Sequence, residues 1–159
     1  MCYNINKYIW YHVLRSYKRI VDNLSCMKVK IDTKERFHAI TLPGNPLSAT
    51  MTEELGACLL PFLQNDVKNV VLILKDIESM DIAAAEKLVS IQQNFYENNA
   101  SFVICELQKP VEEFLDQNEL LEMMNVTPTQ SEAWDIVQME EIEREFLDGG
   151  DIPVGPLSP

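Results

Sequence analysis

The side chains that carry most catalysis and metal binding in proteins are sparse in this chain. It has only two histidines, His12 and His38, and its four cysteines show no CxxC spacing. No serine or cysteine stands in a nucleophile motif, and the sequence contains neither a P-loop nor GxGxxG. We therefore expect a protein that is not an enzyme and has no catalytic residues, metal or cofactor. The cysteines fit the reduced thiols of a cytoplasmic protein, with Cys58 and Cys105 as small core residues.

Carboxylates are the abundant chemical group. The chain has 25 Asp and Glu against 13 Lys and Arg, for a net charge of −12. The acidic run "MEEIEREF" is typical of a solvated helix face and is expected to turn Ile142 and Phe146 inward. The negative charge argues against nucleic acid as a partner. The apolar runs are strand-sized and fall short of the ~18 residues of an integral membrane span.

Residues 1–26 differ from the rest, because their net charge is +3 while residues 27–159 carry −15. Five apolar residues there could share one helix face: Trp10, Leu14, Tyr17, Val21 and Leu24. Two interpretations stay open. The segment is either a helix for a membrane surface or partner, or a non-native extension before a start at Met27. A signal peptide fits poorly, because the apolar stretch is short and basic residues follow it.

Strands and helices are predicted to alternate after residue 27, in the order β-β-α-β-α-β-α-β-α. The run "NVVLILK" is continuous and apolar, which is typical of a strand buried on both faces. The expected strands are 28–32, 36–42, 69–75, 101–107 and 125–128, and the expected helices are 51–65, 82–97, 110–117 and 130–146. This alternation predicts an α/β fold with a mixed sheet. Residues 147–159 are expected to be a disordered tail.

Helix starts are predicted from capping residues. Thr50 and Glu53 form a T-x-x-E capping box, and a second box begins at Thr129. Asp81 is a plausible N-cap directly before an isoleucine and three alanines. Pro61 is expected to kink or end the first helix, because it cannot donate a backbone hydrogen bond.

The run "NVVLILKDIESMDIAAAEKLVSI" resembles the central block of STAS domains, the sulfate-transporter and anti-sigma-factor-antagonist modules. "SFVICELQKPVEEFLDQNELLEMMNVTPTQSEAWDIV" resembles the block that follows. The resemblance covers residues 27–146 and rests on several motifs in the right order and spacing. It implies the α+β STAS fold, with a four- to five-stranded mixed sheet and about four helices packed mainly on one face.

The resemblance also implies a role for the helix start at Asp81. In this family a kinase phosphorylates a serine of an Asp-Ser-Ser-Gly motif and so releases a bound partner. Asp81 matches the aspartate, Ile82 the first serine, Ala83 the phosphorylated serine and Ala84 the glycine. Ala83 has no hydroxyl, so this switch cannot operate there. The expected partner-binding residues lie at two neighbouring helix starts: Gly44, Asn45, Pro46, Ser48, Thr50, Asp81, Ile82, Ala83, Ala84 and Ala85.

The expected partner is an anti-sigma factor or a related kinase-like ATPase, bound in the bacterial cytoplasm to regulate transcription. Two alternatives stay open: a scaffold subunit of a multi-STAS signalling assembly, and an accessory subunit of a lipid-transport ATPase. The oligomeric state and the binding of a small ligand are also open. Phosphorylation at Ser48, Thr50 or Ser79 is possible, although each hydroxyl is expected to be a loop or capping group.

Overall fold

A computed structural model describes residues 29–44 and 46–148. The predicted N-terminal extension and most of the predicted tail lie outside these residues. The described part of the chain contains five strands: β1 (Lys30–Thr33), β2 (Phe37–Thr41), β3 (Asn69–Ile73), β4 (Phe102–Cys105) and β5 (Val126–Thr127). It contains four α-helices, α2 (Ala49–Leu59), α3 (Ile82–Glu97), α4 (Lys109–Gln117) and α5 (Gln130–Asp148), and two short 3₁₀ helices, η1 (Leu60–Gln64) and η2 (Leu121–Met123).

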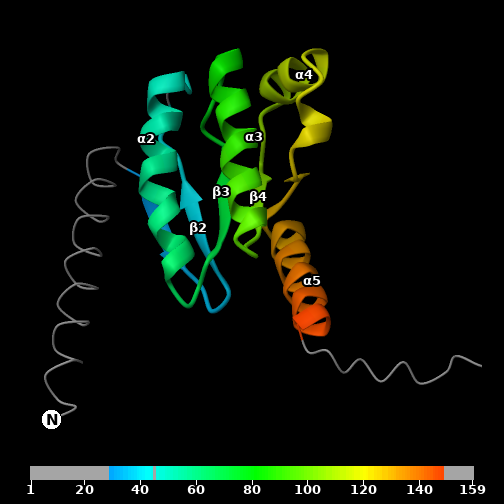
Figure 1. Cartoon of the computed structure of the whole chain (residues 1–159). Coiled ribbons are helices and arrows are strands. Elements are labelled where there is room, and N and C mark those ends of the chain that lie inside the picture. The colour runs from blue at the N-terminus through cyan, green and yellow to red at the C-terminus, as the bar shows by residue number, and fades with distance from the viewer. Residues whose placement is uncertain (1–28, 45, 149–159) are drawn as a thin grey trace, which may run out of the picture.

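The five strands form one mixed sheet in the order β1-β2-β3-β4-β5. β1 pairs with β2 antiparallel, and every other neighbouring pair is parallel. Figure 1 shows α2 and α3 side by side against this sheet. The element order and the mixed sheet predicted from the sequence are both confirmed.

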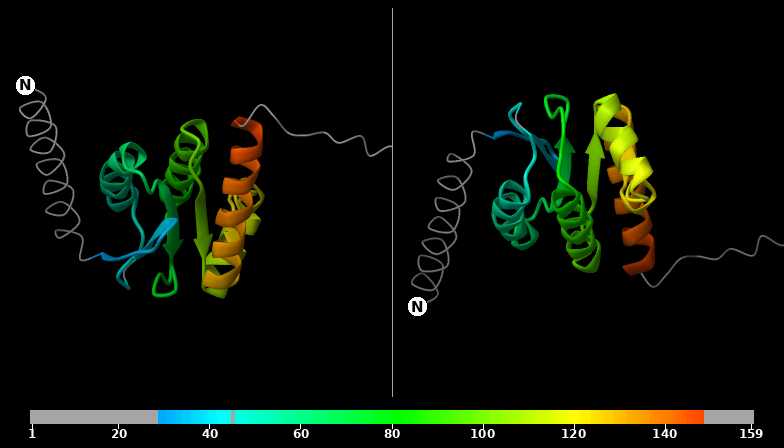
Figure 2. Two further views of the ribbon diagram at one scale, coloured as in Figure 1. Left: turned by 90° about the horizontal axis from the view of Figure 1, so that it is seen from below. Right: turned by 90° about the horizontal axis from the view of Figure 1, so that it is seen from above.

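Helices cover the two faces of the sheet unequally. Side chains of α2, α3 and α4 share the larger core with one face, so most helices do pack on one side. α5 packs on the other face, against a smaller core that includes Phe37, Val71 and Val103. Figure 2 shows α5 apart from the α2–α3 pair.

β3 is the strand whose side chains are buried on both faces, as its sequence predicted. Val70 and Leu72 point into the larger core, whereas Val71 and Ile73 point into the smaller one. Successive side chains of a strand alternate between faces, so this one strand requires a cover on each side.

α2 begins two residues earlier than the capping box predicted. Ser48 is its N-cap, and the Ser48 Oγ accepts a hydrogen bond from the Met51 backbone N–H at 3.3 Å. Thr50 therefore lies in the first turn, and the Thr50–Glu53 capping box is wrong. The cause is the buried Leu47, which bridges to Met80 and keeps the chain extended up to Ser48. The α-helix ends at Leu59, two residues before Pro61, and the chain continues as η1 from Leu60. The early end expected at Pro61 is therefore confirmed.

α3 follows its sequence pattern closely. Asp81 is the N-cap residue in an extended conformation, although its side chain makes no capping hydrogen bond. The predicted stripe of Ala84, Leu88, Ile91 and Phe95 is buried.

The second half of α5 departs from the prediction. Only Ala133 and Val137 of this helix are buried, while Ile142 and Phe146 are 46% and 57% exposed. The expectation that these two residues point inward is wrong. In this half of the helix the residues that face the sheet are Glu140 and Glu141. Their carboxylates accept hydrogen bonds from polar side chains near the amino ends of the strands.

Glu140 anchors α5 beside β4. Its carboxylate accepts hydrogen bonds from the hydroxyls of Tyr96 (2.7 Å) and Ser101, and it pairs with Arg144 at 3.3 Å. Asn125 donates a further hydrogen bond to it at 3.2 Å. This network holds a helix that buries little apolar surface of its own.

Glu141 anchors the same helix beside β2 and β3. It accepts hydrogen bonds from the side chains of Arg36 (2.8 Å) and Asn69 (2.7 Å). The buried Asn69 also donates to the Arg36 carbonyl and accepts from the Ser101 backbone N–H, each at 2.8 Å. One amide side chain therefore links α5 to three strand ends.

We predict that Asn69→Ala lowers the free energy of unfolding by about 2–3 kcal/mol, because it leaves the buried Ser101 N–H without its acceptor. Urea denaturation measures this change. Asn94→Ala, at an exposed position on α3, is the control and should shift stability by less than about 0.5 kcal/mol. An equal effect of the two substitutions would contradict the role given to Asn69.

We predict an alkaline loss of stability that depends on Tyr96. Burial and the hydrogen bond to Glu140 raise the pKa of Tyr96 to about 12, from an ordinary value of 10.0. The unfolded chain loses this proton first, so the stabilisation is complete below pH 10 and disappears as the pH rises from 10 through 12. Chemical denaturation across this range should show a smaller loss for Tyr96→Phe than for the wild type. Equal losses would show that Tyr96 does not contribute.

Candidate functional site

Two loops meet at the carboxyl end of β2 and β3, where α2 and α3 begin. Leu47 of the first loop forms a parallel bridge with Met80 of the second. The Leu47 N–H donates to the Ser79 carbonyl at 2.9 Å, and the Asp81 N–H donates to the Leu47 carbonyl at 3.1 Å. These bonds fix the two helix N-termini next to one another, as the sequence predicted for neighbouring strands. We call residues 44–50 and 79–85 together the two-loop surface.

Close backbone contact holds the two loops together. A Cβ added to Gly44 would lie 3.1 Å from the Asp76 carbonyl oxygen, which is tighter than an ordinary contact. A third loop joins the pair, because the Gln108 side chain donates to the Lys75 carbonyl at 2.7 Å. Gln108 was not predicted from the sequence, because nothing in its local pattern indicates a contact 33 residues away.

Glu106 of the third loop was also missed. Its φ of 57° is in the left-handed region, and its buried Oε2 has no hydrogen-bond partner within the described residues. The sequence carries no signal for either property, since both depend on how β4 ends against its neighbours.

The residues predicted to bind a partner differ in accessibility. Ala84 and Ala85 are fully buried, so their side chains support α3 and cannot touch a partner. Ser48 is half-buried and is used as the cap of α2, whereas Asn45 lies outside the described residues. The exposed members are Gly44, Pro46, Thr50, Asp81, Ile82 and Ala83.

Ile82 and Ala83 form an exposed apolar centre at the start of α3, where Ile82 is 48% exposed. Charged side chains lie near it in the sequence. Four exposed carboxylates and two exposed lysines lie in or beside the second loop: Asp76, Glu78, Asp81, Glu86, Lys75 and Lys87. This stretch therefore combines two exposed apolar residues with an excess of exposed acidic ones. Such a surface suits a protein partner with an apolar contact and a basic rim.

Catalytic and metal-binding groups do not gather here. Within residues 29–44 and 46–148, no three His, Cys, Asp or Glu side chains are placed to hold a metal ion. His38 is buried at the core edge, where its Nε2 lies 3.0 Å from the Val67 carbonyl and its Nδ1 lies 3.0 Å from the Thr33 hydroxyl. Burial lowers the pKa of His38, and its ring stacks on Phe62. Both described cysteines, Cys58 and Cys105, are core residues as expected.

The family of the chain follows from its sequence. A family model for the STAS domain matches residues 28–133. The chain belongs to the STAS family. The matched range includes the two-loop surface and ends in the first turn of α5.

Solved STAS structures share this fold at low sequence identity. A putative anti-sigma factor antagonist from Thermotoga maritima is 20% identical, with a TM-score of 0.60 over 70% of this chain and 95% of its own. The anti-sigma factor antagonist SpoIIAA in its unphosphorylated form is 15% identical, with a TM-score of 0.54 over 69% of this chain and 96% of its own.

The fold also occurs as part of larger proteins. The murine anion transporter Slc26a9 is 12% identical, with a TM-score of 0.56 over 68% of this chain but only 18% of its own. No curated protein sequence matches the chain. None of the helices in the described part of the chain has the length and hydrophobicity to cross a bilayer.

We predict that a carboxylate at two adjacent positions of α3 has little effect on stability at one position and a large cost at the other. Ala83→Asp should change the free energy of unfolding by less than about 1 kcal/mol, because Ala83 is exposed and an acid suits a helix N-terminus. Ala84→Asp should cost about 3 kcal/mol or more, because it buries an unpaired charge. Urea denaturation of both variants checks this. Similar costs would contradict the orientation of the first turn.

Proposed function

We propose that the chain is a non-enzymatic STAS module of the anti-sigma factor antagonist class. It binds an anti-sigma factor or a related kinase-like ATPase in the cytoplasm through the two-loop surface. The observation that carries this proposal is the hydrogen-bonded pairing of two helix N-termini around the exposed Ile82 and Ala83. Membership of the family and the names of the structural neighbours support the class of partner.

We propose further that Ala83 removes the usual off-switch. A helix tolerates a phosphate at its N-terminus, because the helix dipole favours negative charge there. Phosphorylation at this position therefore mainly weakens the binding of a docked partner, through the charge and size of the phosphate. A methyl group at this exposed position keeps the apolar contact and offers no oxygen to a kinase. The bound state would then depend on the partner's abundance and not on phosphorylation of Ala83.

Other hydroxyls at this surface do not replace the lost serine equally well. Ser48 is occupied as the cap of α2, so a phosphate there would also disturb the start of that helix. Thr50 and Ser79 are exposed and remain the accessible acceptors in the described part of the two-loop surface. Phosphopeptide mass spectrometry after incubation with the bound kinase would distinguish them.

We predict that a carboxylate at Ala83 strongly weakens partner binding. The full chain serves as bait in extracts of the source cells, and the bound proteins are identified and quantified by mass spectrometry. Ala83→Asp should reduce the captured partner about tenfold or more, because a carboxylate in the apolar centre must be desolvated on docking. Gln93→Asp adds the same charge at an exposed position on α3, ~15 Å along the helix, and should bind as the wild type does.

The identity of the captured protein discriminates between the proposed functions. An anti-sigma factor or kinase-like ATPase that is lost only with Ala83→Asp supports the proposal. Other STAS proteins would favour the scaffold, and a transporter ATPase would favour the accessory subunit. Equal capture by both variants would contradict docking at the two-loop surface.

A further inference from the structure

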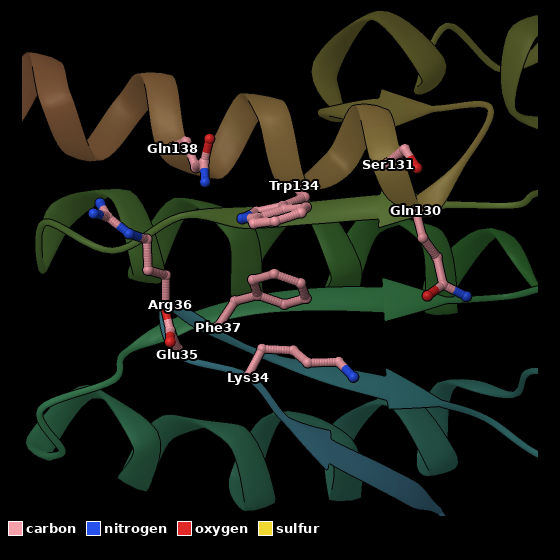
Figure 3. A pocket seen from close by; sticks show the side chains of 8 residues that line it. All are labelled: Lys34, Glu35, Arg36, Phe37, Gln130, Ser131, Trp134 and Gln138. Atoms are coloured by element: carbon pink, nitrogen blue, oxygen red, sulfur yellow. The ribbon is translucent and has the colours of Figure 1, made fainter.

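A groove that contains two aromatic residues, Phe37 and Trp134, among polar ones lies on the opposite face of the sheet from α2 and α3. It has a volume of about 550 Å³ and runs between α5 and the β1–β2 hairpin. In Figure 3 the rings of Trp134 from α5 and Phe37 from β2 face each other across it, with Lys34 alongside. Trp134 is 48% exposed, although an indole of this size gains much from burial.

A row with three apolar residues continues from Trp134 along α5 beyond the groove. Trp134, Gln138, Ile142 and Phe146 follow one another at four-residue spacing, so they form a single row on the helix surface. Ile142, Phe146 and the nearby Met139 are each at least 46% exposed. We call the groove and this row together the α5 face.

The charge of α5 restricts what can cover this face. The helix carries seven acidic residues against Arg144 alone, for a net charge of −6. Of these carboxylates only Glu140 and Glu141 form ion pairs within the described chain. On the other wall of the groove, Lys34 and Arg36 are already paired with Asp32 and Glu141. The occupant must therefore bring apolar side chains together with positive charge.

We propose that residues 1–26 of this chain fold back onto the α5 face. This segment has a net charge of +3, in a chain whose other residues carry −15. Its apolar residues Trp10, Leu14, Tyr17, Val21 and Leu24 fit one helix face, which matches the row on α5. A second copy of the same face is disfavoured, because two strongly acidic helices would repel each other.

The connection to β1 allows this arrangement. Lys30 pairs with Thr41, and Thr41 is ~13 Å along β2 from the groove residue Phe37. A helix of 26 residues spans ~39 Å, which is ample for the length of the groove and row. Lys30 and Asp32 are exposed on this side of β1, since Ile31 between them packs into the larger core. No described helix therefore blocks the path from β1 to the groove.

The two tryptophans of the chain give a direct test, because Trp10 and Trp134 are the proposed contacts. In the full chain with Trp10→Phe, Trp134 is the one remaining tryptophan. Red-edge excitation, which tyrosine does not absorb, isolates its emission, and acrylamide quenching measures its accessibility. Adding Leu14→Asp and Val21→Asp should raise the quenching constant about twofold, because residues 1–26 would no longer shield Trp134 from the quencher. The matched control adds Ser16→Asp and Asn23→Asp, which place the same charge on the polar side, and should leave quenching unchanged.

A reciprocal pair guards against an effect on folding. With Trp134→Phe, Trp10 is the one remaining tryptophan. Adding Ile142→Asp and Phe146→Asp should raise the quenching of Trp10. Both substituted residues are exposed, so these changes leave the core intact. Equal quenching in all variants would overturn the proposal and favour residues 1–26 as an extension with no place on the domain. Quenching that falls with rising protein concentration would also overturn it, in favour of a second copy.

Discussion

The architecture depends on β3, a five-residue strand with every residue buried. A strand of this kind cannot lie at a surface, so each face of the sheet needs its own cover. α2 and α3 cover one face with a large apolar core. α5 covers the other with only Ala133 and Val137 buried, and carboxylates bonded to Asn69, Ser101 and Tyr96 complete its attachment. The fold thus has one mainly apolar side and one side held by charged hydrogen bonds.

The same strand order positions the proposed partner surface. Parallel strands end together, so the loops after β2 and β3 leave the sheet as neighbours. The bridge between Leu47 and Met80 then aligns the starts of α2 and α3. Burial of Ala84 and Ala85 against the core leaves Ile82 and Ala83 as the outward part of the first turn. The proposed docking therefore uses the Ile82 side chain and the Ala83 methyl group, which both point away from the core.

Sequence patterns predicted what depends on local periodicity. The buried strand "NVVLILK", the stripe of α3 and the break at Pro61 all follow from spacing and backbone chemistry, and the structure agrees. The start of α2 was missed because a tertiary bridge at Leu47 overrides the capping preference of Thr50. Ile142 and Phe146 were placed inward because periodicity cannot tell which face of a helix meets the sheet. Glu106 and Gln108 were missed because their roles arise only where distant loops meet.

Hydrogen–deuterium exchange of the full chain, alone and with its captured partner, locates the docking surface. A partner docked on the paired helix starts should slow exchange in residues 46–50 and 79–86, where the N-terminal amides of α2 and α3 lie. Exchange in α4 should stay as it is in the free protein. Protection elsewhere, with these two segments unchanged, would show that the partner docks on another surface.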